Sequence, residues 1–477
     1  MRLIAAALCA VSTVSAFAQE TEATIDAYAA GYKAALTCSG VFNAGKSVEQ
    51  IAADELTGIY PLVAETVQAL PAAVIDREAG QVRVRYSPTM PPRVAQWRPH
   101  LGCVQLPVGA PASAGKHMPR ITADWRDINP RQDDGAPWTR HAAINGSSGN
   151  AALDQAIDAA FTGGFGQDAK TSTVLIATPD TVLAERYAAG FDETTSQRTW
   201  SVAKSIAATV IGAAAHQGLI DVKAPADLAN WSHPVDPRGA ITVEHLLHMS
   251  SGLDSNRAGN RTDRLYLGGG LVTDTATQRA LEAKPGTRWK YANNDTLLAV
   301  RALTERLGGG QAALRFPFEA LLYRIGMTHT RPETDWRGDF ILSSQVWTTA
   351  RDLARLGVLY LNDGVWDGER ILPPGWVAYV STPAPAQPPE TGSRGAIPGY
   401  GAQWWLYNER FPELPNDAFA ARGNRGQYVM IIPSRDLVIV RRGYDPAGGE
   451  GFELHRFTEA VLKALGVIGL KCCVRPH

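Results

Sequence analysis

The sequence predicts an α+β fold, because strand-like runs lie near both ends of one long region, residues 150–468, and helical patterns fill its middle. The strand-like runs are short, apolar and bounded by turns: residues 172–178, residues 182–189 and a hairpin whose first strand begins at Gln427. Helical patterns enclose them at residues 151–161 and 453–465. Strands that are segregated from helices along the chain are typical of the α+β class.

A small accessory unit, residues 19–107, precedes this region. We expect helices at residues 23–36 and 48–56 and a strand at 81–86. Residues 108–149 are rich in Pro, Gly, Asp and Arg, with few apolar runs, which predicts an extended linker. Residues 469–477 then form a short tail.

The first 18 residues have the pattern of a secretory signal peptide. Met1-Arg2 is followed by an apolar stretch to about Val14, and Ala16-Phe17-Ala18 provides a small-residue cleavage site. Cys9 lies inside the apolar stretch, which argues against a lipoprotein. No later run of about 18 apolar residues is present in the sequence. We therefore expect an exported protein, periplasmic or secreted, without a membrane span.

Charge and cysteine content narrow the range of partners. With 46 basic and 47 acidic residues, the net charge is −1. The sequence therefore lacks the excess of positive charge that is typical of nucleic-acid-binding proteins, and we expect a small-molecule or short-peptide substrate. Four cysteines follow the signal peptide and allow three pairings. Cys38 and Cys103 bracket the N-terminal unit, so we expect them to pair in an oxidising compartment, adding roughly 4 kcal/mol. No function is assigned to the adjacent Cys472 and Cys473.

A serine and a lysine three residues apart begin the most informative segment, Ser201-Val-Ala-Lys204. A serine hydroxyl is a weak nucleophile until a neighbouring base accepts its proton. If Ser201 opens a helix, the i,i+3 spacing places both side chains on one face. An apolar stripe from Val202 to Ala214 predicts a buried helix, in which the Lys204 amine would lose proton affinity and act as that base.

Two later segments supply groups that complete such a site. Tyr291 and Asn293 follow a turn and can point the same way, so the Tyr291 phenol can carry a proton as tyrosinate or as a relay. Gly423 and Gly426 precede a strand and let the backbone approach a ligand closely. The N–H after Gly423 and that of Ser201 can then form an oxyanion hole. A simple bulge at a strand edge is the alternative for the glycines.

These segments, in this order, resemble the serine β-lactamase and penicillin-binding-protein superfamily, in its class C β-lactamase-like branch. Ser201 and Lys204 match the S-x-x-K motif, and Tyr291 and Asn293 match the Y-x-N motif. Three further segments match the branch: residues 241–253, 348–361 and 370–373. The sequence motif Ala-Arg-Gly-x-x-Gly-Gln at residues 421–427 is most similar to the motif of the 6-aminohexanoate-dimer hydrolase group.

The resemblance implies a fold and a set of roles. The first and last strands would form one antiparallel sheet flanked by the terminal helices, an α/β sandwich, with an all-helical subdomain against one face and the active site between them. Catalysis would use Ser201, Lys204 and Tyr291, with the backbone N–H groups of Ser201 and Asn424 as the oxyanion hole. Asn293 and Gly423 would contact the substrate, and we expect no cofactor.

One departure from the superfamily pattern affects the substrate. β-Lactamases and D,D-peptidases of this superfamily carry Lys or His at the first position of the third motif, where this chain has Ala421. Losing that cation disfavours penicillin-type carboxylates. The direction of the Arg422 side chain is left open by the sequence. Residues 255–271 and 381–400, the latter followed by Trp404 and Trp405, are the loops expected to shape specificity.

We therefore expect an exported serine hydrolase that cleaves an amide or ester bond of a small substrate through an acyl-enzyme on Ser201. A D-aminopeptidase or D,D-peptidase/β-lactamase-like activity on cell-wall peptides is the first alternative, and a catalytically inactive peptide-binding protein is the second. Glu244, His245 and His248 could suggest a metal site, because two histidines three residues apart share a helix face. A metal site is disfavoured, because no third ligand for the two histidines is evident at useful spacing.

Overall fold

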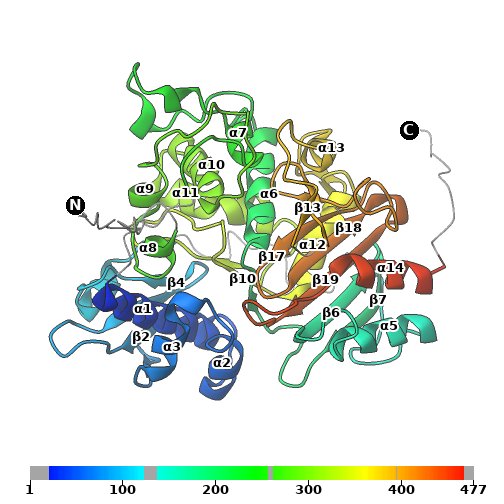
Figure 1. The fold of residues 1–477 in the computed structure, drawn as a ribbon, viewed down its shortest axis with the longest axis horizontal. Helices are drawn as coiled ribbons and strands as arrows, with labels where there is room; N and C mark the ends of the chain where they lie inside the picture. Colours follow the sequence, from blue (N-terminus) through cyan, green and yellow to red (C-terminus); the bar gives the residue numbers. More distant parts are fainter. Residues whose placement is uncertain (1–20, 123–136, 256–261, 394, 467–477) are drawn as a thin grey trace, which may run out of the picture.

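The computed structural model describes residues 21–122, 137–255, 262–393 and 395–466 (Figure 1). The expected signal peptide, Cys472, Cys473 and the expected tail lie outside these ranges. None of the helices within them has the length and apolar character needed to cross a bilayer.

An eight-stranded sheet forms the centre of the region expected to be catalytic, residues 150–468, and also includes β5 from the preceding segment. The strand order is β15-β16-β17-β18-β19-β6-β7-β5. The strands from the end of the chain therefore pair with those from the start of the region, as β19 does with β6. All pairs are antiparallel except β5 with β7 at one edge. In sheet order the bounds are Gly399–Tyr400, Trp405–Leu406, Phe419–Gly423, Gln427–Ile432, Leu437–Gly443, Thr171–Ala177, Thr181–Tyr187 and Arg140–His141.

Helices cover both faces of this sheet. Along β6, Val174 and Ile176 pack with α5 (Ala151–Phe161) and α14 (Leu454–Ala464). Leu175 and Ala177 belong to the opposite cluster, with α6 (Val202–His216) and α12 (Ala350–Leu361). Successive side chains of a strand face opposite ways, so a run that is apolar throughout is buried on both faces. The predicted α+β class, with helices flanking an antiparallel sheet, is confirmed.

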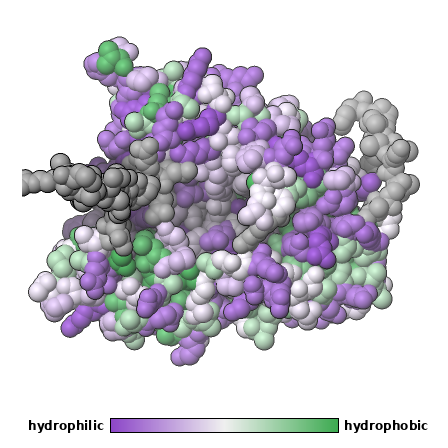
Figure 2. All heavy atoms as spheres, viewed as in Figure 1, coloured by the Kyte–Doolittle hydropathy of each residue, from purple (hydrophilic) through white to green (hydrophobic). Residues whose placement is uncertain are grey.

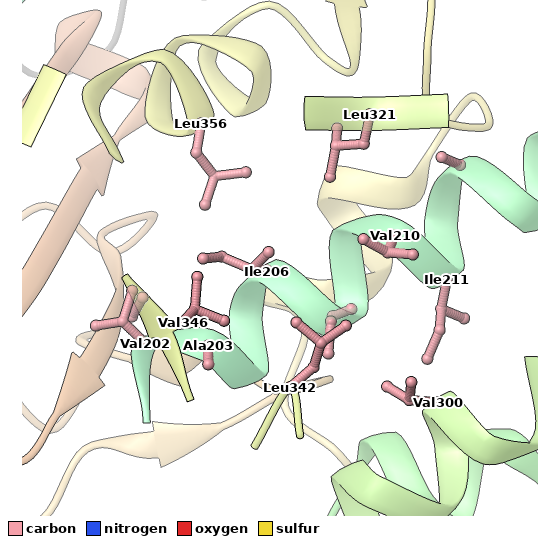
Figure 3. Close-up of a cluster of buried hydrophobic side chains, with 14 of the residues drawn as sticks. Val202, Ala203, Ile206, Val210, Ile211, Val300, Leu321, Leu342, Val346 and Leu356 are labelled. Atoms are coloured by element: carbon pink, nitrogen blue, oxygen red, sulfur yellow. The ribbon is translucent and has the colours of Figure 1, made fainter. Parts of the chain in front are cut away.

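Helix α6 runs through the centre of the molecule, between the sheet and the helical subdomain (Figure 1). Its side chains contact apolar residues on every side, among them Val300, Leu321, Val346 and Leu356 (Figure 3). This buried environment is the one that the apolar pattern after Ser201 predicts. The subdomain contains α7 (Val243–Leu247), α8 (Asp263–Tyr266), α9 (Val272–Thr275), α10 (Asn293–Arg306), α11 (Gly310–Pro317), a π-helical turn (Phe318–Leu322) and, beyond α12, α13 (Trp376–Ser381).

Several short strands lie outside the main sheet. Strand β8 (Gln197–Arg198) precedes Ser201 and pairs with β10 (Val346–Thr348), which also pairs with β9 (Arg331–Pro332). Two further hairpins are β11–β12 (Val365–Trp366, Glu369–Arg370) and β13–β14 (Thr391–Gly392, Gly395–Ala396). Pairing of β8 with β10 fixes the chain directly before the candidate nucleophile.

The N-terminal unit packs three helices against a four-stranded antiparallel sheet, β1-β2-β3-β4. The helix expected at residues 23–36 extends to Phe42, and the strand expected at 81–86 is β2. One helix and three strands were not predicted. The bounds are α1 Glu22–Phe42, α2 Val48–Asp54, α3 Pro61–Ala69, β1 Val74–Asp76, β2 Gln81–Val84, β3 Arg93–Arg98 and β4 Gly102–Gln105. A disulfide joins Cys38 to Cys103, the expected pairing.

Buried polar contacts join this unit to the catalytic region. The carboxylate of Glu333 accepts hydrogen bonds from Ser39 Oγ at 2.5 Å and from the Cys103 N–H at 3.1 Å. Lys46 forms an ion pair with Glu55 at 2.8 Å and donates to the hydroxyl of Tyr444, which follows β19. In the face shown by Figure 2, hydrophobic residues gather over this unit, while most of the remaining surface is hydrophilic or intermediate. The region predicted as a linker contributes a 3₁₀ turn (Ala112–His117) and β5.

Candidate active site

Ser201 stands at the N-terminal end of α6 as its N-cap residue. The residue before it, Trp200, has a φ of 49°, a left-handed conformation that is uncommon for a bulky residue and occurs often at functional sites. The sharp turn between β8 and α6 leaves Ser201 half-buried, at the wall of two cavities described below. As the N-cap residue, Ser201 has a backbone N–H that lies outside the i→i−4 hydrogen bonds of the helix.

Lys204 lies one turn along α6, with its side chain almost fully buried at 1% exposure. Its Nζ atom is 3.1 Å from Ser201 Oγ, 2.7 Å from Asn293 Oδ1 and 2.7 Å from the Ser343 carbonyl oxygen. Burial lowers the pKa of Lys204 from 10.5 to about 7, as the sequence predicts for a buried amine without a nearby carboxylate.

The three neighbours of Lys204 define the direction of its lone pair. Asn293 Oδ1 and the Ser343 carbonyl oxygen only accept hydrogen bonds. A neutral amine has two N–H groups, and these two oxygens use both. The remaining position on nitrogen faces Ser201 Oγ, where the lone pair can accept the hydroxyl proton. The geometry is therefore suited to a general base that acts on Ser201.

Tyr291 lies next to both Ser201 and Lys204, with its ring centroid 5.0 Å from Lys204 Nζ. Burial raises the pKa of Tyr291 to about 12, although a hydrogen bond with Ser201 and the charge of Arg422 lower it in part. The phenol is therefore protonated at neutral pH. Of the two forms considered from the sequence, a tyrosinate base and a proton relay, the structure favours the relay.

Asn293, the first residue of α10, holds Lys204 rather than standing free. Its Oδ1 accepts from Lys204, and its Nδ2 donates to Thr262 Oγ1 at 2.9 Å. The contact with Lys204 was not predicted, and neither was the part played by the Ser343 carbonyl. Asn293 also lines one of the cavities beside Ser201, so its expected contact with substrate stays a prediction.

Gly423 ends β17 beside the N-terminal end of α6. A Cβ atom at Gly423 would lie 2.3 Å from the Thr199 carbonyl oxygen and 3.2 Å from the Ser201 nitrogen. Only a residue without a side chain allows the two backbones to come this close. Asn424, the next residue, lines both cavities together with Ser201, where the two N–H groups expected to hold an oxyanion would meet a substrate carbonyl.

Replacing Gly423 with alanine is expected to lower kcat by roughly 10²-fold or more. The added methyl group forces β17 away from Thr199 and Ser201, which enlarges the oxyanion hole, and losing one oxyanion-hole donor costs about this much. Steady-state kinetics measures the loss. Gly448→Ala is the control, because a Cβ at Gly448 meets no atom within 4 Å and only its φ of 85° is strained. Equal kcat for Gly423→Ala and the wild type would contradict this account of Gly423.

Arg425 anchors the turn that carries Asn424. It adopts a φ of 57° and is buried. Its guanidinium donates to two carbonyl oxygens of the N-terminal unit, those of Asp54 and Thr57, both at 2.7 Å. Sequence reasoning missed this residue, because the contact joins positions about 370 residues apart. The N-terminal unit therefore holds the candidate oxyanion turn in place.

Two cavities meet at Ser201. The larger, of about 850 Å³, is lined by residues of the 381–400 loop and by aromatic side chains that include Tyr291 and Trp405. Arg422 lines this cavity, and its guanidinium carbon lies 5.6 Å from the centre of the Trp405 ring. The Arg422 side chain, whose direction the sequence leaves open, therefore points toward this cavity. The smaller, of about 350 Å³, is lined by Thr262, Asp263 and Tyr266 of the first expected specificity loop. Trp404 is fully buried in the core.

His245 and His248, considered above as possible metal ligands, contact other residues of the protein. His245 Nδ1 accepts from the Thr242 N–H in a capping box at the start of α7. Burial lowers the pKa of His248 to about 4, and its ring packs on Tyr379. Within the parts of the chain that the structure describes, no three His, Cys, Asp or Glu side chains form a group that would hold a metal ion.

Known proteins resemble this chain in sequence and in fold. A family model described as beta-lactamase matches residues 153–441. The 6-aminohexanoate-dimer hydrolase of Paenarthrobacter ureafaciens is 29% identical over 298 residues, which cover 57% of this chain and 72% of that protein. The N-terminal unit lies outside the residues that the family model matches.

Two solved structures are similar in fold. A putative 6-aminohexanoate-dimer hydrolase from Bacillus anthracis has a TM-score of 0.55 at 22% identity and covers 71% of this chain and 89% of its own. A family VIII carboxylesterase has a TM-score of 0.54 at 16% identity, with coverages of 68% and 99%. Because the family model spans more than half of the sequence, the chain belongs to the beta-lactamase family of serine hydrolases.

Proposed function

We propose that this protein hydrolyses an amide or ester bond of a small linear substrate through an acyl-enzyme on Ser201. The observation that carries the proposal is the environment of Lys204: a buried amine with a pKa of about 7, with two acceptors on its N–H groups and Ser201 Oγ at 3.1 Å. A protein that only binds peptides has no need for a buried amine in this arrangement.

In the first half of the reaction the Ser201 hydroxyl proton passes to Lys204 Nζ as Oγ bonds to the substrate carbonyl carbon. The N–H groups of Ser201 and Asn424 hold the oxyanion, aided by the positive end of α6. The C–N or C–O bond of the substrate then breaks. The Tyr291 hydroxyl gives its proton to the leaving nitrogen or oxygen and regains one from the Lys204 ammonium.

In the second half, water takes the position of the leaving group. Its proton passes to Tyr291 and Lys204 as its oxygen bonds to the acyl carbon. The bond between that carbon and Ser201 Oγ breaks, and Oγ regains a proton from Lys204. The carboxylic acid leaves and the free enzyme is restored. Asn293 keeps Lys204 in place and faces the substrate in the smaller cavity.

The relative of Paenarthrobacter ureafaciens is named as a 6-aminohexanoate-dimer hydrolase, which supports a linear amide as the substrate. Ala421 supports the same choice, because its methyl group replaces the cation with which β-lactamases and D,D-peptidases bind a carboxylate. We further propose that the mature protein is exported. Its N-terminal sequence and the Cys38–Cys103 disulfide support this location, since disulfides persist in oxidising compartments.

Tyr291→Phe is expected to reduce amide hydrolysis at least about tenfold more than hydrolysis of an activated ester. An amine leaving group needs the phenol proton, whereas p-nitrophenolate leaves without one, and general acid catalysis contributes about 10² to 10⁴ in rate. The measurement is kcat/KM on a p-nitrophenyl ester and on an amide with the same acyl chain. Equal losses on both substrates would remove Tyr291 as the general acid.

A substrate panel tests the proposal as a whole. It comprises a short p-nitrophenyl ester, the linear 6-aminohexanoate dimer, a D-alanyl peptide and a chromogenic cephalosporin. We expect turnover of the ester and the linear amide, with little of the cephalosporin. Preference for the D-alanyl peptide would move the assignment to cell-wall peptides. Failure to turn over every member would favour the binding protein.

A further inference from the structure

The smaller cavity beside Ser201 is built from two distant parts of the chain. Tyr32 of α1 and Tyr60, directly before α3, come from the N-terminal unit, which lies outside the family match. Arg198 and Trp200 come from the segment that leads into α6. The N-terminal unit is therefore part of the active-site wall and is more than an attachment to the hydrolase.

Close backbone packing holds Tyr32 in this wall. A Cβ atom at Gly31 would lie 2.2 Å from the Leu267 carbonyl oxygen, so the glycine lets α1 approach the segment after α8. Arg93 Nη1 donates to the same carbonyl at 3.2 Å, and Gln105 Nε2 donates to the Tyr266 carbonyl at 2.6 Å. The N-terminal unit thus fixes both Tyr32 and the facing wall at Tyr266.

Arg198 brings a positive charge into this cavity. Its side chain is 5% exposed and its guanidinium carbon lies 3.9 Å from the centre of the Trp200 ring. The guanidinium donates to Ser344 Oγ at 3.0 Å, while its Nε is buried without a hydrogen-bond partner. Among the residues that the structure describes, no carboxylate lies within ion-pair distance of it. Buried charges normally have such a partner.

The charge of Arg198 acts on the carboxylate of Glu333, but the hydrogen bonds that Glu333 accepts come from other groups. Ser39, Asn43 and the Cys103 N–H all donate to its Oε1 atom. Burial raises the pKa of Glu333 to about 7, with Arg198 lowering it only in part. A carboxyl group that is partly protonated at neutral pH is a weak counterion, so Arg198 keeps most of its capacity for an anion.

Tyr32 adds a second donor. Its side chain is 3% exposed and its hydroxyl is buried without a hydrogen-bond partner. Burial raises the pKa of this hydroxyl to about 12, so it is a neutral donor. Buried polar side chains are hydrogen-bonded in the large majority of cases. Tyr32 and Arg198 both line the cavity that opens at Ser201, and among the described residues neither the Tyr32 hydroxyl nor Arg198 Nε has a hydrogen-bond acceptor.

We propose that the smaller cavity is a subsite for a carboxylate group of the substrate, which Arg198 and the Tyr32 hydroxyl bind together. The proposal rests on the proposed function and specifies its substrate class: a linear amide or ester that carries a free carboxylate on one side of the bond. Asp263 also lines the cavity, so the test compares an anionic with a neutral ligand. The recognition element comes in part from the N-terminal unit.

The test uses the full-length Ser201→Ala protein, which binds without turnover. Calorimetry measures its affinity for 6-acetamidohexanoate and for the N-methylamide of the same acid, two probes that differ in one negative charge. We expect the acid to bind at least about tenfold tighter. Arg198→Gln and Tyr32→Phe, each added to Ser201→Ala, should reduce this ratio, with the larger fall for Arg198→Gln because it removes a charge.

Tyr86→Phe is the matched control. Tyr86 belongs to the same unit and its hydroxyl is also buried without a partner among the described residues, but it lines two cavities to which Ser201 does not contribute. Its removal should leave the ratio unchanged. Tyr32→Phe changes one oxygen atom and keeps the ring, so it tests the subsite even if Arg198→Gln fails to fold. Thermal unfolding of each variant shows whether the fold is retained.

The possible outcomes separate this proposal from the one on which it rests. Equal affinity for the two probes, binding of neither, or a ratio that Tyr32→Phe and Arg198→Gln leave intact overturns the carboxylate subsite, even where the wild type hydrolyses esters through Ser201. A preference for the acid that depends on both residues supports the subsite. If the wild type then hydrolyses nothing on the panel, the proposed function has failed while the subsite stands.

Discussion

Ser201→Ala is expected to abolish turnover of every substrate that the wild type hydrolyses, with a loss of at least about 10³-fold in kcat. In the proposed mechanism the hydroxyl forms the covalent bond to the acyl group. Of the described residues that line both cavities, Ser201 is the one whose hydroxyl lies 3.1 Å from the Lys204 amine. Two nearby serines are engaged otherwise: Ser344 Oγ accepts from Arg198, and Ser343 contacts Lys204 through its backbone carbonyl. The measurement is kcat on the most rapidly hydrolysed member of the panel.

Two observations make the Ser201 result specific. A burst of p-nitrophenol in the wild type, absent in Ser201→Ala, reports the acyl-enzyme. The variant should unfold at nearly the same temperature as the wild type, because the change removes one half-buried oxygen atom. Ser250→Ala is a suitable control, since Ser250 is a buried serine that donates to the His245 carbonyl outside both cavities. Near-full activity of Ser201→Ala would exclude the assignment.

Lys204→Met is expected to cost about as much as Ser201→Ala, because the two side chains act as one unit. In such units the double variant is hardly slower than the worse single variant. Methionine keeps the apolar stem of lysine and removes the amine, so the packing of α6 changes little. Kinetics of both single variants and of Ser201→Ala/Lys204→Met measures the coupling. Losses that multiply in the double variant would show that Lys204 does not act on Ser201.

The wild type should also show the titration of this amine. The neutral form is the base, and the pKa of Lys204 is lowered from 10.5 to about 7. Below pH 7 the amine is protonated, so kcat/KM should rise about tenfold per pH unit and level off above pH 7. A profile that is flat from pH 5 to 8 would exclude Lys204 as the titrating base.

Asp295 provides the control for this profile. It lies on α10 two residues from Asn293, and burial raises its pKa to about 7 as well, although hydrogen bonds from Ser251 lower it in part. Asp295→Asn keeps an acceptor for Ser251 and removes the titration. If Lys204 is the titrating group, the break near pH 7 persists in Asp295→Asn. Its disappearance in that variant would assign the profile to Asp295.

The contact between Ser201 and Lys204 in the candidate site could be predicted from the sequence because it depends on local geometry. The spacing of Ser201 and Lys204 brings their side chains together on any helix, and the apolar residues that follow make that helix buried. The lowered pKa of Lys204 follows from this burial alone. In the main sheet, β6, β7 and β18 are apolar runs between turns, and their first residues were predicted to within one position. Strands β5, β15, β16 and β17 were not predicted, because they are short or lie in segments rich in Gly and Pro.

The N-terminal sheet could not be predicted in the same way. Strand β3, Arg93–Arg98, is buried along most of its length, yet its sequence RVAQWR carries Arg93, Gln96 and Arg98 at buried positions. Arg93 donates to the carbonyl oxygens of Ala27 and Leu267, which lie 66 and 174 residues away in sequence. A strand whose buried side chains are polar gives no apolar alternation, and the contacts that stabilise it are invisible before the chain is folded.

The bonds from Arg425 to Asp54 and Thr57 limit how this enzyme can be recombined with its relatives. The same N-terminal unit that contributes Tyr32 to one wall also carries the two carbonyl oxygens that anchor the turn of Asn424. A chimera that exchanges residues 21–106 to alter substrate choice would also change the contacts that anchor the candidate oxyanion turn. Under the two proposals selectivity and turnover then depend on the same N-terminal unit, so a graft has to carry Arg425 together with that unit.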